Sequence, residues 1–274
     1  MHALKKDILD TELLPTQSAL WYLGQEGFLI KNDGTYILID PYLSEYVDKN
    51  CCELVEWRRL YPTPIDPCEL DFIDLVICTH AHYDHADPYT LSAIAGASRE
   101  AKFIVPAPIT DTFVGYGIEK ERIISAVSDT PIAYKKTNIV PVPAAHEELH
   151  SDEFDNYFEL SYIIENPSGR LFHGGDMCLY PDLERHLRGI DVAMLPINGR
   201  DFYRGALDII GNLTAEEAIL LSKRIDAKLL VPMHYDLYEV NRVSETMFIN
   251  ALERLNPKQR HHEFIPSEKY IFMK

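Results

Sequence analysis

The sequence has no apolar run long enough to cross a lipid bilayer. Its longest apolar stretches, such as residues 36–39 and 229–233, span only a few residues, whereas a membrane-spanning helix needs about 20. The first residues, MHALKKDILDTELLP, contain neither a continuous apolar segment nor a small-residue cleavage site, so a secretory signal is not expected. We therefore expect a cytoplasmic protein without a membrane partner.

Basic residues are also few. The chain has 26 Lys and Arg against 43 Asp and Glu, which gives a formal net charge of −17 at pH 7. Tight binding to nucleic acid needs a basic surface that neutralises phosphates, so a nucleic-acid partner is not expected. A small anionic substrate is still compatible with this charge if a few local arginines or lysines bind it.

The sequence lacks the regular cysteine spacing of a disulfide framework or a CxxC zinc clip, and its number of cysteines is odd. Of the five cysteines, Cys51 and Cys52 are adjacent and the others are scattered. Free thiols in a reducing compartment fit this pattern. The overall composition, with 46% hydrophobic and 25% charged residues, excludes a disordered chain and a bare coiled coil.

What the sequence does contain is a series of short apolar runs separated by turn residues. Strands are predicted over residues 19–23, 28–31, 36–39, 75–78, 103–105, 139–142, 158–164, 170–173, 191–195 and 228–232, and in two short runs around residues 266–268. Helices are predicted over residues 89–97, 109–116, 182–187, 214–224 and 244–255. Residues 1–17 are interpreted as a polar lead-in and residues 41–70 as a long irregular connection.

This order of elements favours an α/β fold. Two strand-rich halves, with helices that follow strands, predict an αββα sandwich of two mixed β-sheets with outer helices. The length of 274 residues suits one domain over residues 1–274. A doubly wound parallel sheet is the competing architecture.

The strongest functional signal is the segment THAHYDH, residues 79–85, directly after a predicted buried strand. Functional sites of α/β proteins usually lie at the carboxyl ends of strands. The segment holds four side chains that can bind metals: His80, His82, Asp84 and His85. Imidazole and carboxylate are typical ligands of Zn, Mn, Fe or Ni, so we expect one or two cations here.

Three further candidate ligands follow later strands. His146, Asp176 and His234 each come after an apolar run that ends in small residues or proline. Gly174 and Gly175 would let the backbone turn tightly before Asp176. Each residue alone is a weak signal, but their order after the first cluster predicts one shared site.

The ordered motifs THAHYDH, AAHE, GGD and PMH resemble those of the metallo-β-lactamase fold superfamily, and the resemblance covers essentially the whole chain. It implies a site for two metal ions. The first ion would be held by His80, His82 and His146, the second by Asp84, His85 and His234, and Asp176 would bridge them.

A narrower resemblance is to the L-ascorbate 6-phosphate lactonase branch. It is carried by WYLGQEGFLI (21–30), GYGIEKERII (115–124), HGGD (173–176), INGRD (197–201), IIGNLTAEEA (209–218) and VPMHYDLY (231–238). Longer members of that branch carry extra terminal sequence that is absent here, and some lack a histidine at the position of His146. The resemblance implies a homo-oligomer that uses Mn²⁺, whereas the Irving–Williams order favours Zn²⁺ at such a site.

The function implied by this resemblance is a metal-dependent hydrolase that opens a phosphorylated sugar-acid lactone, such as L-ascorbate 6-phosphate, by attack of metal-bound hydroxide. Two cations about 3.5–4 Å apart lower the pKa of a bound water and polarise the scissile carbonyl. Asp84 is the candidate catalytic residue, which would orient the hydroxide or carry a proton to the leaving alkoxide. Thr79 and Glu147 are expected to support the ligands.

Substrate binding is assigned to the segments that follow the strand over residues 191–195. Arg200 and Arg204 are candidate forks for a phosphate or carboxylate. Asn212 precedes the predicted helix over residues 214–224, whose free amides can hold a phosphate. Ion pairs of the two arginines with nearby aspartates are the alternative interpretation.

The same candidate metal ligands are compatible with other functions. A phosphodiesterase or nuclease would use the same dinuclear centre, although the acidic charge argues against a nuclease. An iron-dependent redox protein would be expected to have more carboxylate ligands and a flavin module, and the sequence shows neither. A non-catalytic member of the fold is disfavoured because all seven candidate ligands are present.

Overall fold

The first of two stacked β-sheets has seven strands in the order β13-β1-β2-β3-β4-β5-β6, in a computed structural model that describes residues 2–274. The strands are β1 (Gln17–Gly24), β2 (Gly27–Asn32), β3 (Thr35–Ile39), β4 (Leu75–Ile77), β5 (Lys102–Pro106), β6 (Ile123–Ala126) and β13 (Lys269–Met273). Pairing is antiparallel from β13 to β3 and parallel from β3 to β6, so the sheet is mixed.

The second sheet has six strands in the order β12-β11-β10-β9-β8-β7. They are β7 (Ile132–Tyr134), β8 (Thr137–Pro143), β9 (Leu160–Asn166), β10 (Gly169–His173), β11 (Val192–Pro196) and β12 (Leu229–Met233). Strands β10, β11 and β12 run parallel, and β7 to β10 pair antiparallel. This sheet is therefore mixed as well, and a doubly wound parallel sheet is excluded.

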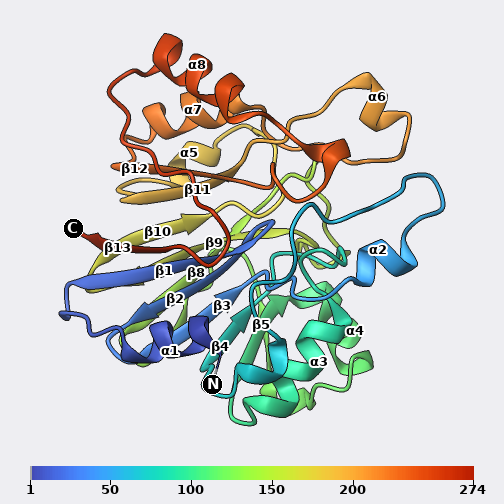
Figure 1. Cartoon of the computed structure of the whole chain (residues 1–274), viewed down its shortest axis with the longest axis vertical. Coiled ribbons are helices and arrows are strands. Elements are labelled where there is room, and N and C mark those ends of the chain that lie inside the picture. Colours follow the sequence, from blue (N-terminus) through green and yellow to red (C-terminus); the bar gives the residue numbers. More distant parts are fainter. Residues whose placement is uncertain (1) are drawn as a thin grey trace.

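Helices cover the outer face of each sheet (Figure 1). The helices of residues 2–274 are α1 (Ala3–Asp10), α2 (Tyr46–Asn50), α3 (Pro88–Ala97), α4 (Thr110–Gly115), α5 (Leu183–His186), α6 (Phe202–Gly205), α7 (Ala215–Arg224) and α8 (Glu245–Leu255), with short 3₁₀ turns over Pro67–Glu69, Ala107–Ile109, Lys120–Arg122 and Glu239–Asn241. Helices α1, α3 and α4 lie below the first sheet, and α5, α7 and α8 lie above the second. The predicted αββα sandwich is confirmed.

Both faces of strand β1 are buried, because each face packs against a different hydrophobic core. Leu20 and Tyr22 belong to the core between the sheets, whereas Trp21 and Leu23 belong to the core under the helices. Successive side chains of a strand point to opposite faces, so the continuous apolar run over residues 19–23 supplies both cores. A core shared by both sheets is what a single domain requires, and the one-domain organisation stays a prediction.

Three sequence predictions of local structure differ from the structure. The polar lead-in contains helix α1, whose Leu4 and Ile8 are buried against the first sheet. Of the two strand-like runs near residue 266, only β13 forms, and it pairs with β1. Strands β6 and β7 were not predicted, because each is a short run that is stabilised by pairing with β5 or β8.

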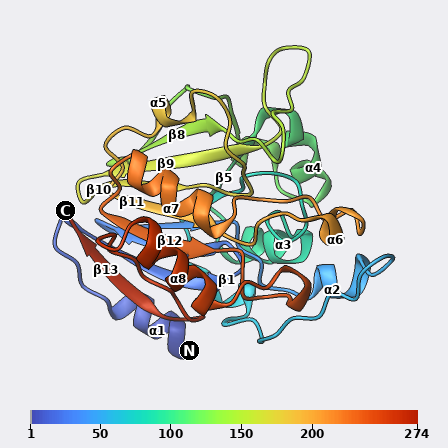
Figure 2. The same cartoon turned by 90° about the horizontal axis from the view of Figure 1, so that it is seen from above.

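The long connection over residues 41–70 is irregular, as predicted, apart from α2 and one 3₁₀ turn. It is tied to the segment after β12 by Tyr42 and Tyr238, whose hydroxyl oxygens lie 2.8 Å apart. Asp48 accepts hydrogen bonds from both hydroxyls. Helices α2 and α6 lie at the same edge of the molecule in two perpendicular views (Figure 2). Among the described residues, none of the helices has the length and apolar character needed to cross a membrane.

Candidate metal centre

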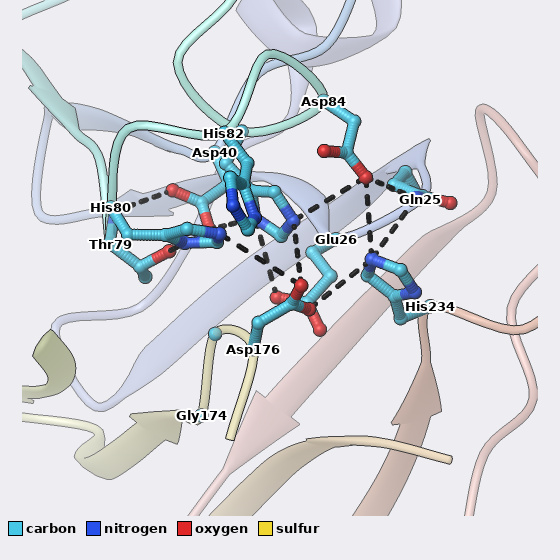
Figure 3. A network of polar contacts seen from close by, with 12 residues as sticks. Gln25, Glu26, Asp40, Thr79, His80, His82, Asp84, Gly174, Asp176 and His234 are labelled. Carbon is cyan, nitrogen blue, oxygen red and sulfur yellow. Dashed lines mark hydrogen bonds and ion pairs between the residues drawn. The ribbon is translucent and has the colours of Figure 1, made fainter. Parts of the chain in front are cut away.

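The seven candidate ligands come from the carboxyl ends of four strands. The segment from His80 to His85 follows β4, His146 follows β8, Asp176 follows β10 and His234 follows β12. The structure gathers them in two groups whose ligand atoms lie within 4.8 Å of one another: His80, His82, His146 and Asp176 in one, and Asp84, His85 and His234 in the other. Figure 3 shows how most of these side chains point toward one another.

In the first group the donor atoms are closely spaced. Nε2 of His146 lies 3.3 Å from Nδ1 of His82 and 3.4 Å from Oδ2 of Asp176. Nε2 of His80 lies 3.9 Å from the same carboxylate oxygen. His80, His146 and Asp176 are buried, whereas His82 is exposed toward the pocket beside the centre.

The second group has the same spacing. Oδ2 of Asp84 lies 3.4 Å from Nε2 of His234 and 3.6 Å from Nε2 of His85. The two groups meet at Asp176, whose Oδ1 lies 3.2 Å from Nε2 of His234 and whose Oδ2 lies 3.6 Å from Nε2 of His85. Asp176 is thus the carboxylate that faces both groups.

These separations fit metal coordination. Two atoms bound at about 2.1 Å to one tetrahedral ion lie about 3.4 Å apart, close to the spacing of His146, His82 and Asp176. In addition, Nε2 of His80 and Nε2 of His85 are buried and have no hydrogen-bond partner among the described residues. A buried nitrogen without a partner costs free energy, and a cation would satisfy both. The donor set therefore fits the binding of divalent metal.

Hydrogen bonds on the far side of two rings fix which nitrogen faces the centre. Nδ1 of His85 lies 2.9 Å from Oδ2 of Asp40, and Nδ1 of His80 lies 3.0 Å from Oγ1 of Thr79. The Thr79 hydroxyl in turn donates to Asp40 over 2.6 Å. In their neutral form both histidines therefore carry the proton on Nδ1 and direct the Nε2 lone pair inward, which is the tautomer that binds a metal.

Burial keeps the first group of histidines neutral. Loss of hydration lowers the pKa of His80 well below its usual value, and His85 and His82 act in the same direction. The same cause lowers the pKa of His146 to about 4. Partial loss of hydration also lowers the pKa of His82, although its ring is exposed toward the pocket. Neutral imidazole is the metal-binding form, so this group is ready for a cation at pH 7.

In the second group, nearby carboxylates raise the pKa of the histidines more than burial lowers it. Burial opposes protonation of His234, but the charge of Asp176 and the hydrogen bond of Asp84 raise its pKa to about 9. Burial likewise opposes protonation of His85, and Asp84 and Asp176 raise its pKa well above the usual value. The pKa of Asp84 is lowered because His85 and His234 outweigh its burial.

The backbone before Asp176 makes the tight turn that the two glycines predict. Gly175 has a φ of +61°, and a Cβ added there would lie 2.8 Å from Cβ of Thr79. The left-handed conformation and the close approach both favour glycine. The turn brings Asp176 against the strand end that carries Thr79 and His80.

Three residues near the centre were not predicted from the sequence. Asp40 follows β3 and binds Thr79 and His85, so the same strand-end argument would have found it. Gln25, in the β1–β2 turn, donates from Nε2 to Oδ2 of Asp84 over 2.7 Å. Glu26 is fully buried behind His85 without a hydrogen-bond partner, and burial raises its carboxyl pKa; nothing in the sequence indicates it.

Of the expected supporting residues, Thr79 contacts His80 and Asp40, whereas Glu147 does not reach the ligands. The Oε1 atom of Glu147 accepts a hydrogen bond from the Gly211 amide over 2.8 Å. Glu147 is exposed and fastens the loop before α7. The prediction that Glu147 supports the candidate ligands is therefore corrected.

The three predicted substrate-binding residues are engaged within the protein. Arg200 forms two 2.7 Å hydrogen bonds to the carboxylate of Glu217. Arg204 donates to the backbone carbonyls of Val240 and Asn198. Neither arginine lines the pocket beside the metal centre.

Asn212 lies behind Asp176. Its side chain is fully buried, and Nδ2 donates to Oδ1 of Asp176 over 2.9 Å and to Oδ1 of Asn198 over 3.1 Å. Asn212 is absent from the lining of the pocket. A substrate contact by any of the three stays a prediction that these contacts do not favour.

The chain belongs to the family described as the β-lactamase superfamily domain, which its sequence matches over residues 35–235. Together with the αββα fold and the histidine–aspartate donor set, this match defines a metal-dependent hydrolase of the metallo-β-lactamase superfamily. The resemblance found in the sequence motifs is thereby confirmed.

Individual relatives are distant. An Escherichia coli protein (strain E24377A) named a probable L-ascorbate-6-phosphate lactonase, UlaG, is 24% identical over 296 residues, covering 96% of this chain and 82% of its own length. The structure of Igni18, a metallo hydrolase of Ignicoccus hospitalis, is 24% identical with a TM-score of 0.67, covering 94% of this chain and 100% of its own. YhfI of Bacillus subtilis, a metallo-β-lactamase fold protein, is 14% identical with a TM-score of 0.68, covering 93% and 99%.

Proposed function

We propose that this chain is a metal-dependent lactonase, which hydrolyses the ring ester of a lactone to the hydroxy acid. The observation that carries the proposal is the position of Asp176 between two groups of histidines, beside an open pocket. The similarity to the Escherichia coli protein supports a lactone as the substrate class. We also propose two divalent ions per chain, Mn²⁺ or Zn²⁺, and a homo-oligomeric assembly.

The metal ions would supply the acid–base power of the site, because divalent ions lower the pKa of water and polarise a carbonyl oxygen. The residues proposed to hold them are His80, His82, His146, Asp84, His85, His234 and Asp176, as expected from the superfamily. In the reaction, water adds to the ring carbonyl, the ring carbon–oxygen bond breaks, and the proton passes to the leaving alkoxide or to solvent.

Asp84 is the residue that we propose to orient the water and carry that proton. Its Oδ2 atom is engaged with Gln25 and His234, whereas its Oδ1 atom has no hydrogen bond to the described residues. Asp84 is half-buried and lines the pocket. Its second oxygen is therefore free to accept a proton from a water in the pocket.

The experiment that tests the proposal combines metal analysis with a substrate screen. Protein purified without added metal is analysed for bound metals and then assayed, after loading with Mn²⁺ or Zn²⁺, on γ-lactones and on bis(p-nitrophenyl) phosphate. We expect hydrolysis of a lactone and loss of that activity after chelation. If only the phosphodiester is hydrolysed, the lactonase proposal is wrong and the alternative function, a phosphodiesterase, replaces it.

A further inference from the structure

The pocket beside the metal centre has apolar walls. Besides the metal-binding residues, it is lined by Val47 and Trp57 from the connection over residues 41–70, and by Ile209 and Ile210 from the loop before α7. Trp57 is held by edge-to-face packing on Tyr238, with ring centroids 5.1 Å apart. These side chains offer a surface to an apolar group of a substrate.

The lining of this pocket contains no lysine or arginine among residues 2–274. Apart from the candidate metal ligands, the charged residue in the pocket lining is Asp208, whose carboxylate is exposed. Arg200 and Arg204 line a separate cavity beside the start of α7. A phosphate on the substrate would therefore lose its hydration in this pocket and find no lysine or arginine to pair with. It would also lie near the Asp208 carboxylate, in a chain with a net charge of −17, and both repel an anion.

The pocket does offer an uncharged polar group. Asn241, in the 3₁₀ turn after β12, is 5% exposed and lines the pocket, and its Oδ1 atom is buried without a hydrogen-bond partner among the described residues. A buried amide without a partner is unfavourable. A hydroxyl or amide N–H of a bound substrate would donate a hydrogen bond to it without bringing a charge.

We propose, on the basis of the lactonase function above, that this pocket selects an uncharged lactone with an apolar substituent. The substituent packs on Trp57, Ile209 and Ile210. Oδ1 of Asn241 accepts a hydrogen bond from an uncharged donor of the bound molecule, a hydroxyl or an amide N–H. The substrate class thus differs from the phosphorylated lactone expected from the sequence resemblance, because the walls that recognise substituents carry no cation.

A series of γ-butyrolactones with one ring and three substituents at C5 tests the proposal: pentyl, hydrogen and phosphooxymethyl. With metal-loaded protein we expect kcat/KM for the pentyl compound to exceed that for the phosphooxymethyl compound by about tenfold or more. Ile210→Arg places a cation in the pocket and should reduce this preference by about tenfold. Ile271→Arg is the matched control, since Ile271 in β13 is 45% exposed against 43% for Ile210 and lies outside the pocket.

Binding to Asn241 is measured separately from hydrolysis. The 5-pentyl and 5-phosphooxymethyl pyrrolidinones, which are lactams, are titrated against Trp57 fluorescence, with Trp57→Phe to assign the signal. The pentyl lactam should bind about tenfold more tightly than the phosphorylated one, and Asn241→Leu should weaken it by about tenfold. Asn32→Leu removes an equally buried amide far along the chain in β2, so it should lower thermal stability without changing this binding.

The outcomes separate the two proposals. If no lactone is hydrolysed but the pentyl lactam still binds more tightly, the lactonase function fails and the apolar pocket stands. If the phosphooxymethyl lactone is the better substrate and the phosphorylated lactam the better ligand, the substrate class is wrong while the lactonase function stands. Unchanged lactam binding in Asn241→Leu would overturn the role of Asn241.

Discussion

Asn212 donates a hydrogen bond of 2.9 Å from its side-chain amide to Oδ1 of Asp176. The same carboxylate oxygen lies 3.2 Å from Nε2 of His234. Asn212 therefore fixes the orientation of the residue that faces both groups of candidate ligands. Such outer contacts tune metal affinity although they never touch the metal.

The first prediction concerns this contact. Asn212→Leu keeps the volume of the side chain but removes the donor, so metal affinity should fall by about 10–100-fold. The measurement is competition with a chromophoric chelator, with Asn32→Leu as a control for loss of a buried amide. Equal metal affinity in Asn212→Leu and the wild type would show that the contact has no part in holding the metals.

Asp176→Ala should have a larger effect. Because one carboxylate faces both groups, its removal should lose more than one metal equivalent per chain and abolish hydrolysis. Metal analysis and an activity assay check this. Asp191→Ala is the control: Asp191 is also a buried aspartate, paired with Lys228 rather than with the centre. Loss of a single equivalent would mean that Asp176 binds one ion only.

Much of this candidate centre was predictable from the sequence because its candidate ligands follow apolar strands. Strands β4, β8, β10 and β12 are buried runs that the hydrophobic pattern identifies, and their ends meet at one edge of the sandwich. Helix α1 was missed because its two buried residues, Leu4 and Ile8, stand in a charged segment. Its docking also depends on the Trp21 indole, which donates to Asp7.

The directions of side chains were less predictable. Asp40 reaches Thr79 because β3 pairs with β4 in a register that sets Ile39 beside Ile77, and the sequence does not specify that register. Arg200 follows a strand of the site, as expected, but its guanidinium turns toward Glu217. Glu217 is held by the capping box of α7, so a contact within the protein decides the orientation.

Replacement of Asp84 separates proton transfer from binding. Asp84→Asn keeps the shape and the contact with Gln25 but removes the proton acceptor, so kcat should fall by about 10²–10⁴-fold while KM changes little. Stopped-flow assays and metal analysis of the same samples are the measurements. If the loss of activity only follows a loss of metal, Asp84 acts as a ligand and not as the proton carrier.

Metal binding should release protons at pH 7. In the metal-free chain, the pKa of His234 is raised to about 9 and that of His85 is also raised, so both rings are protonated at pH 7 and must lose a proton when they bind a metal. His146, with its pKa lowered to about 4, releases none. The affinity of the second group should therefore rise as the pH increases from 7 to 9.

Calorimetric titration of chelator-treated protein in buffers of different ionisation enthalpy measures this release. The first ion bound should show little dependence on the buffer, and the second should show release of protons. A second ion that binds at pH 7 without proton release would contradict the raised pKa values of His85 and His234.

Arg200 provides the last test, because the sequence predicts a phosphate contact and, in the structure, its guanidinium forms a salt bridge with Glu217. Both its terminal nitrogens are bonded to Glu217, and one also donates to the backbone carbonyl of Asn212. Arg200→Ala should therefore cost about 0.5–1 kcal/mol of folding free energy and change kcat/KM by less than about twofold for charged and uncharged lactones alike. Arg185→Ala, at an exposed ion pair with Asp182, is the control in both thermal unfolding and kinetics. A loss of about one to two decades for the phosphorylated lactone alone would restore Arg200 as its ligand.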